Sequence, residues 1–89
     1  MKTKKNYKKV ATIDLGSNGI RMLISNLYKI KGKYFHTKNT LHRVPIRLGQ
    51  DAFTSGKISV KNEKKLLSAL SAFKNLMDAN EIIDYLGYA

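Results

Sequence analysis

The chain has 89 residues, of which 43% are hydrophobic; it has no cysteine and carries 17 Lys and Arg against 6 Asp and Glu. This length holds at most one small domain and the apolar content suffices for a core, which excludes a two-lobed enzyme and a wholly disordered chain. Without cysteine there is no disulfide framework, thiol nucleophile or thiolate zinc site, and no stretch has the length of a membrane span. We therefore expect a cytoplasmic protein that does not bind membranes.

The excess positive charge lies in the first half of the chain. Residues 1–47 contain 12 Lys and Arg and one acid, Asp14, whereas residues 48–89 contain five Lys and five acids. Such a field attracts phosphate-bearing partners in a salt-dependent way. Nucleic acid, polyphosphate, nucleotides and anionic lipid all stay open, as does the simpler alternative that lysines keep a small domain in solution.

The first half of the chain predicts a basic tail followed by strands. Residues 1–9 are expected to be a disordered tail. The apolar, β-branched or alternating segments predict three strands: residues 10–13, 20–30 and about 34–48. Tight turns at residues 16–19 (GSNG) and 31–33 (KGK) would join them as antiparallel neighbours. Pro45 is compatible with the third strand if that strand lies at a sheet edge or has a bulge, where no amide donor is needed.

The second half predicts a loop, a helix and a last strand. Residues 49–59 (GQDAFTSGKIS) are typical of a loop, and Ser59 is a good N-cap with Glu63 in the first helical turn. The apolar stripe expected to face a sheet consists of Leu66, Leu70, Phe73 and Met77. Asn80 would end the helix because Asn tolerates the left-handed conformation, and residues 81–89 read as a strand. The order β-β-β-α-β predicts an α/β fold with a mixed sheet.

Residues 14–21 (DLGSNGIR) combine residue types that indicate a mechanism. A carboxylate at a strand end precedes two glycines that bracket Ser17 and Asn18, so the backbone N–H groups can converge on an anion. Arg21, in the returning strand, has a planar guanidinium that suits phosphate oxygens. Asp14 would repel a bare phosphate. Its presence beside the turn is explained if it holds a divalent cation or orients a water. A plain hairpin turn explains the same residues, so spacing alone leaves both interpretations open.

The stretch VATIDLGSNGIRMLI, residues 10–24, resembles the first phosphate-binding motif of the Ppx/GppA family. This family comprises exopolyphosphatases and guanosine pentaphosphate phosphohydrolases of the actin, sugar kinase and Hsp70 superfamily. Four later segments agree with the family pattern: IRLGQDAF at 46–53, GKIS at 56–59, LLSALSAFKNLM at 66–77 and IIDYLGYA at 82–89. The resemblance therefore covers residues 10–89, which would form the N-terminal part of a Ppx/GppA-like phosphatase lobe.

The resemblance implies a ribonuclease H-like (actin-like ATPase) lobe and hydrolysis of a terminal phosphate of polyphosphate or guanosine pentaphosphate, with Mg²⁺ as cofactor. Asp14 would lie near the metal or the water. Residue by residue, the implied phosphate contacts are Gly16, Ser17, Asn18, Gly19, Arg21 and Arg47. Family members commonly have Ser where this chain has Gly19, which predicts a looser turn with one hydroxyl donor fewer.

The family's catalytic glutamate, second glycine-rich loop and opposing lobe would lie beyond Ala89. We therefore expect no catalytic residue here and no phosphatase activity from the 89-residue chain alone, because half a cleft cannot position water and charge. Sheet edges and apolar surface without their normal cover would favour a homo-oligomer.

Nucleic-acid binding is the alternative function. GSNG is also a GxxG, the loop with which KH domains clamp a nucleic-acid backbone, and the size and charge of the chain are suitable. Four aromatic side chains could stack on bases: Tyr7, Tyr28, Tyr34 and Phe35. A KH loop joins two helices, however, whereas this GxxG lies between predicted strands beside Asp14.

Overall fold

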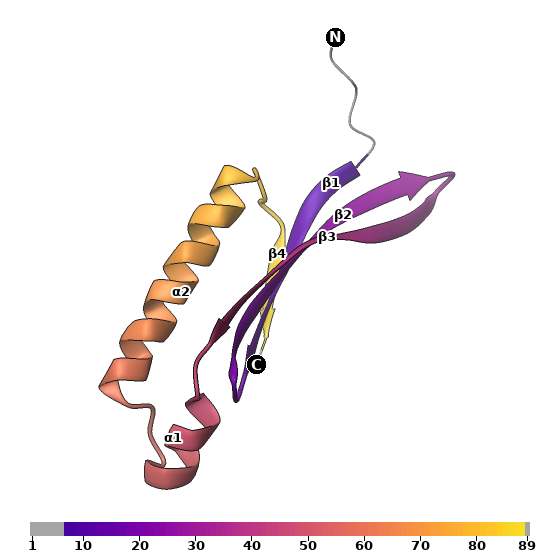
Figure 1. The fold of residues 1–89 in the computed structure, drawn as a ribbon. Coiled ribbons are helices and arrows are strands. Elements are labelled where there is room, and N and C mark those ends of the chain that lie inside the picture. The colour runs from indigo at the N-terminus through magenta and orange to yellow at the C-terminus, as the bar shows by residue number, and fades with distance from the viewer. Residues whose placement is uncertain (1–6, 89) are drawn as a thin grey trace.

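The structure is a computed structural model that describes residues 7–88. Its elements are β1 (Tyr7–Gly16), β2 (Gly19–Ile30), β3 (Lys33–Pro45), α1 (Leu48–Ser55), α2 (Val60–Ala79) and β4 (Tyr85–Tyr88) (Figure 1). The first strand begins at Tyr7, three residues earlier than expected, so residues 7–9 belong to this strand and not to the expected tail; residues 1–6 lie outside the described part. No helix in that part is long and apolar enough to cross a membrane.

The four strands form one mixed sheet in the order β3-β2-β1-β4. β1 pairs antiparallel with β2, β2 antiparallel with β3, and β4 lies parallel to β1. This confirms the α/β fold with a mixed sheet. The edge position of β3 explains Pro45, which ends the strand three residues before the expected boundary because its nitrogen has no hydrogen to donate.

The connection between β3 and the long helix differs from the expected loop. Residues 48–55 form α1, a helix ended by Gly56, whose φ of 72° is left-handed and whose N–H donates to the Ala52 carbonyl at 3.0 Å. Glycine adopts this conformation without the steric penalty of a Cβ. The expectation of a loop was wrong because a helix this short, with Leu48 as its only buried residue, leaves almost no apolar period in the sequence.

Asp51 joins the two helices. Its Oδ2 accepts hydrogen bonds from the Ser59 backbone N–H at 2.9 Å and from the Asn62 side-chain amide at 2.8 Å. These two bonds, the backbone one first, lower the pKa of Asp51 from its ordinary value of 3.8. They stabilise the charged carboxylate in the folded chain alone, so the junction between the helices depends on its ionisation.

We expect acid to weaken this junction. A lowered folded-state pKa contributes stability that is complete above pH 3.8 and is lost as the pH falls through the lowered value. The difference in urea midpoint between the wild type and Asp51→Asn should therefore be larger at pH 6 than at pH 3. Glu63→Gln, which removes a carboxylate from the first turn of α2, is the control. The prediction would be contradicted if the difference in urea midpoint between the wild type and Asp51→Asn were the same at pH 6 and at pH 3.

α2 begins and ends as the sequence predicted, with one difference in detail. The Ser59 hydroxyl accepts from the Asn62 N–H at 3.2 Å and so caps the first turn. At the other end Asn80 has φ −96°, and it is Glu81 that takes the left-handed conformation, with φ 58°. The Ile82 N–H then donates to the Met77 carbonyl at 2.8 Å, so the chain reverses in a Schellman motif.

The core lies between α2 and one face of the sheet. Its buried side chains are Ala11, Ile20, Met22, Ile24, Ile46, Leu48, Ala69, Phe73, Met77 and Ile82. The predicted stripe is partly wrong: Phe73 and Met77 are buried and Leu66 packs against the core, but Leu70 is 38% exposed. Ala69 takes the buried place beside Phe73, so the contact face of α2 is rotated slightly from the predicted one.

Candidate anion-binding site

The turn between β1 and β2 is held from outside through its carbonyl groups. Gly16 and Gly19 form the last pair of the β1–β2 ladder, with Ser17 and Asn18 between them. The Gly49 N–H donates to the Ser17 carbonyl at 2.7 Å, and the Ile46 N–H donates to the Asn18 carbonyl at 3.1 Å. These bonds leave the N–H groups of Ser17 and Asn18 without an acceptor among residues 7–88. The turn is thus fixed by its oxygens while its donors stay available.

Two glycines permit this close packing. A Cβ added to Gly19 would lie 2.5 Å from the Val44 carbonyl oxygen, and one added to Gly49 would lie 2.7 Å from the Ser17 Cβ. Real Cβ atoms do not make contacts this short, so β3 and the start of α1 could not lie as close to the turn. The expectation that Gly19 loosens the turn was therefore wrong, since its missing side chain is what allows β3 to hold the turn tightly.

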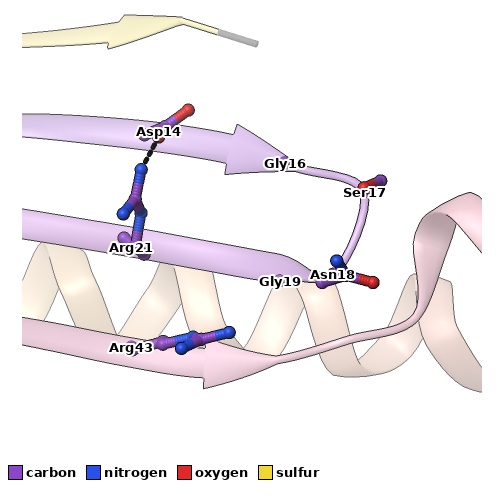
Figure 2. A pocket seen from close by; sticks show the side chains of 7 residues that line it. All are labelled: Asp14, Gly16, Ser17, Asn18, Gly19, Arg21 and Arg43. Carbon is purple, nitrogen blue, oxygen red and sulfur yellow. Dashed lines mark hydrogen bonds and ion pairs between the residues drawn. The ribbon is translucent and has the colours of Figure 1, made fainter.

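Charged residues from three strands form a row beside the turn. Asp14 on β1 is paired in register with Arg21 on β2, and Arg21 with Arg43 on β3. Their neighbours Ile13 and Met22 pack in the core, so the row lies on the face that α2 does not cover. Figure 2 shows the Arg21 guanidinium reaching across to the Asp14 carboxylate, with which it forms an ion pair, and Arg43 extending along β3 toward the turn.

Turn and row together line a hollow of about 260 Å³. The lining residues are Asp14, Gly16, Ser17, Asn18, Gly19, Arg21 and Arg43. Six of these seven were candidates from the sequence, and the structure brings all six together. Arg43 was missed, because only its cross-strand partner Arg21 reveals which end and face of the sheet it occupies.

Arg47, the remaining candidate, lies elsewhere. It stands between the buried residues Ile46 and Leu48, so its own side chain is exposed, and it lines a separate hollow between the end of β3 and the two helices. That hollow also contains Asp51, whose carboxylate is engaged by α2. The motif Arg-Leu-Gly, residues 47–49, thus holds the turn through the Gly49 N–H and buries Leu48 in the core, while its arginine lies outside the row.

The electrostatics of the hollow favour an anion. The hydrogen bond to Asp14 and, second, the charge of that carboxylate raise the pKa of Arg21, so the guanidinium stays protonated. Asp14 compensates one arginine, and Arg43 forms no salt bridge within residues 7–88, which leaves one net positive charge in the row. A guanidinium has five N–H donors, so Arg21 can hold Asp14 with one edge and still present others to a ligand.

The residues present do not make a metal site by themselves. Asp14 is the carboxylate in the hollow, and its charge is already compensated by Arg21. A Mg²⁺ ion in proteins is usually held by one or two carboxylates together with substrate phosphates and waters. Because the single carboxylate is used to hold an arginine, we assign no step to the Mg²⁺ that the sequence resemblance implied.

The arrangement of the strands and helices identifies the fold. A mixed sheet of three antiparallel strands and a fourth parallel strand, covered by one long helix, matches the N-terminal lobe of the actin-like ATPase fold. Solved structures that share this arrangement include Ppx/GppA proteins and an exopolyphosphatase. No family model and no curated protein sequence matches the chain.

Three of these structures can be compared directly. The Ppx/GppA family member of Aquifex aeolicus is 21% identical, with a TM-score of 0.77 over 91% of this chain and 25% of its own. The type II variant of the A. aeolicus Ppx/GppA phosphatase is 23% identical, with a TM-score of 0.74 over 90% of this chain and 25% of its own. An exopolyphosphatase from Cytophaga hutchinsonii is 19% identical, with a TM-score of 0.72 over 90% and 24%. The chain has the fold of the N-terminal part of these proteins and spans about a quarter of their length.

Proposed function

We propose that this chain provides the first phosphate-binding hairpin of a Ppx/GppA-type phosphatase, and that the hollow beside residues 16–19 holds a terminal phosphoryl group of polyphosphate or of a guanosine polyphosphate. Arg21 and Arg43 would neutralise the phosphate oxygens, and the free N–H groups of the turn would donate to them. Asp14 would act by orienting Arg21. The cytoplasm is the expected location, since nothing in this cysteine-free chain requires an oxidising compartment.

One observation carries this proposal. The turn is tied to the protein through the carbonyls of Ser17 and Asn18, which uses up the groups that would repel an anion and spares the donors that would bind it. The two arginines of the row then lie at the same end of the sheet as these donors. The central N–H groups of a two-residue hairpin turn are ordinarily left to water; here the carbonyl groups beside them are engaged, so the turn offers donors and no free backbone acceptor of its own.

The proposed role of the chain is binding and not hydrolysis. Among residues 7–88, the lining of the hollow contains one carboxylate, which is paired, and no second acid or histidine that could activate a water. We therefore expect the 89-residue chain to bind phosphate chains without releasing inorganic phosphate. Self-association through the uncovered sheet face, where Leu41 is 45% and Tyr88 55% exposed, stays a prediction that light scattering can test.

The proposal is tested by titrating the chain with inorganic tripolyphosphate in a calorimeter at low ionic strength. Arg21→Ala should reduce the affinity roughly 10- to 100-fold, since a hydrogen bond to a charged group contributes about 1.5–3 kcal/mol. Arg47→Ala is the matched control, because it removes the same charge from a side chain that lies outside this hollow. Guanosine pentaphosphate in a parallel titration indicates whether a nucleoside adds affinity.

Equal losses for Arg21→Ala and Arg47→Ala would contradict the proposal, because they would mean that only the general positive field attracts the ligand. Phosphate release by the highly purified chain, measured with malachite green, would contradict the expected inactivity. Residues 16–19 join two antiparallel strands, whereas a KH loop joins two helices, so the KH-type alternative has no support from the fold, and nucleic-acid binding through this turn stays a prediction.

A further inference from the structure

The end of the β2–β3 hairpin forms a projecting ribbon, which we call the arm and define as residues 27–38. β1 pairs with β2 only as far as Tyr7 and Tyr28, so beyond Tyr28 the arm has two strands within the described residues. It points away from both helices (Figure 1). The turn at Lys31 and Gly32, with φ of 51° and 79°, closes it as a tight hairpin.

The arm is distinct from the anion-binding hollow. β2 runs 12 residues from Gly19 at the hollow to Ile30 at the arm, a length of roughly 36 Å at about 3.3 Å per residue. A bulge separates the two ends: the register shifts between Ile24 and Ser25, where Asn39 on the opposite strand has no partner in the ladder. Bulges bend and twist a ribbon, so the arm leaves the plane that packs on α2.

Aromatic and aliphatic side chains stand exposed on this arm. Tyr34 is 65%, Ile30 53% and Phe35 50% exposed. The register pairs Tyr34 with Lys29 on one face and Phe35 with Tyr28 on the other. Single exposed apolar residues are ordinary, but Tyr34 and Phe35 lie on opposite faces of a projecting ribbon and each keeps half or more of its surface exposed, which leaves them available to a ligand.

The arm is also purely basic. It carries four lysines and no acid: Lys29, Lys31, Lys33 and Lys38. The nearest acids in the sequence are Asp14 and Asp51, so the arm lies in the middle of an acid-free stretch. Lys29 Nζ lies over the Tyr34 ring, 5.5 Å from its centre, so a cation and an aromatic ring meet on this face of the arm.

We propose that the arm binds single-stranded nucleic acid, with Tyr34 and Phe35 stacking on unpaired bases and the lysines neutralising the backbone phosphates. Exposed rings interleaved with cations are what sequence-tolerant single-strand binding requires. Inorganic polyphosphate would use the lysines but has nothing to stack on the rings. A membrane-inserting tip would gather its apolar residues at the turn, whereas the tip here is Lys31, Gly32 and Lys33.

The test measures fluorescence anisotropy of labelled rU15 and dT15 with the full 89-residue chain. The double variant Tyr34→Ala with Phe35→Ala should weaken binding of an oligonucleotide at least tenfold, given the contribution of about 1–3 kcal/mol per stacked base. Its control is Phe53→Ala with Tyr85→Ala, which removes two exposed aromatic side chains from α1 and β4 and should leave affinity within about twofold. A preference between rU15 and dU15, which differ in the 2′-hydroxyl alone, would show whether that group is read.

The lysines are tested through salt dependence. Lys31→Gln with Lys33→Gln should reduce the slope of log affinity against log salt by about 1.4, because each single-strand phosphate contributes about 0.7. Lys64→Gln with Lys65→Gln on α2 removes equal charge and should leave the slope unchanged. All four lysine side chains are exposed, so both double variants should keep the thermal midpoint of the wild type. The variant of Lys31 and Lys33 therefore tests the arm independently if the aromatic double variant fails to fold.

Three results would overturn the proposal: equal losses in the arm and control aromatic variants, competition by tripolyphosphate as effective as unlabelled dT15 at equal phosphate, or binding to phosphatidylserine vesicles with none to either oligonucleotide. The arm and the hollow are separable. Arm variants should retain tripolyphosphate binding, and Arg21→Ala should retain oligonucleotide binding, so failure of one proposal does not imply failure of the other.

Discussion

Replacing Phe73 by alanine is expected to lower the free energy of unfolding by about 3–5 kcal/mol, the usual effect of removing a fully buried phenyl ring. Phe73 is 2% exposed and is the largest fully buried side chain where α2 meets the sheet. A domain of this size has a total stability of roughly 4–13 kcal/mol. The variant should therefore lose between about a quarter and all of its resistance to urea, measured by the circular dichroism of α2.

The matched control lies on the other side of the same helix. Leu67 is 57% exposed, so Leu67→Ala should change the unfolding free energy by no more than about 0.5 kcal/mol. Alanine is the best helix former, so a change in helix propensity cannot account for destabilisation by either variant. Equal destabilisation by the two changes would mean that α2 does not rest on the sheet through Phe73.

The same helix shows how far a periodic pattern determines a fold. Its existence, its cap at Ser59 and its end near Asn80 all follow from local sequence. Its buried face does not: Leu70 fits the apolar period as well as Ala69, yet Leu70 is 38% and Ala69 5% exposed. The sheet decides between them, because the small side chain at position 69 lets α2 come close to the strands.

The site shows a second limit, which arises from register. A two-residue turn at Lys31 and Gly32 fixes the first pairs of the hairpin, and continuing that register would place His42 opposite Arg21. The bulge at Asn39 shifts the pairing by one residue and brings Arg43 there instead. A slip of one residue exchanges the two faces of a strand, so Arg43 could not be found without knowing the bulge.

The glycines, more than the charged residues, determine how the turn packs against β3 and α1. From the sequence, Gly19 was read as a lost hydroxyl and residues 47–49 as a source of one phosphate-binding arginine. In the structure, another backbone or side chain lies so close to Gly19 and to Gly49 that a Cβ at either position would clash with it. The two segments therefore depend on each other, and the shape of the turn is set by residues about 30 positions later in the chain.

This dependence predicts that Gly19→Ala damages both stability and binding. The added methyl group would lie 2.5 Å from the Val44 carbonyl oxygen and 3.2 Å from the Pro45 Cα, and backbone atoms cannot move aside as a flexible side chain would. We expect a loss of about 1–3 kcal/mol in unfolding free energy, as for other overpacked sites. Because β3 must retreat, the bond from the Ile46 N–H to the Asn18 carbonyl would be lost, and tripolyphosphate affinity should fall about tenfold with it.

Gly87→Ala separates this effect from the general consequences of replacing a glycine in a strand. Gly87 lies in β4, and a Cβ there would meet its nearest atom, the Ile13 carbonyl oxygen, at 4.0 Å, an ordinary contact. Urea midpoint and calorimetric titration of the two variants give stability and binding on the same samples. If Gly19→Ala retained full anion affinity despite a lower midpoint, the position of the turn would not depend on β3, and the hollow would owe its affinity to the arginines alone.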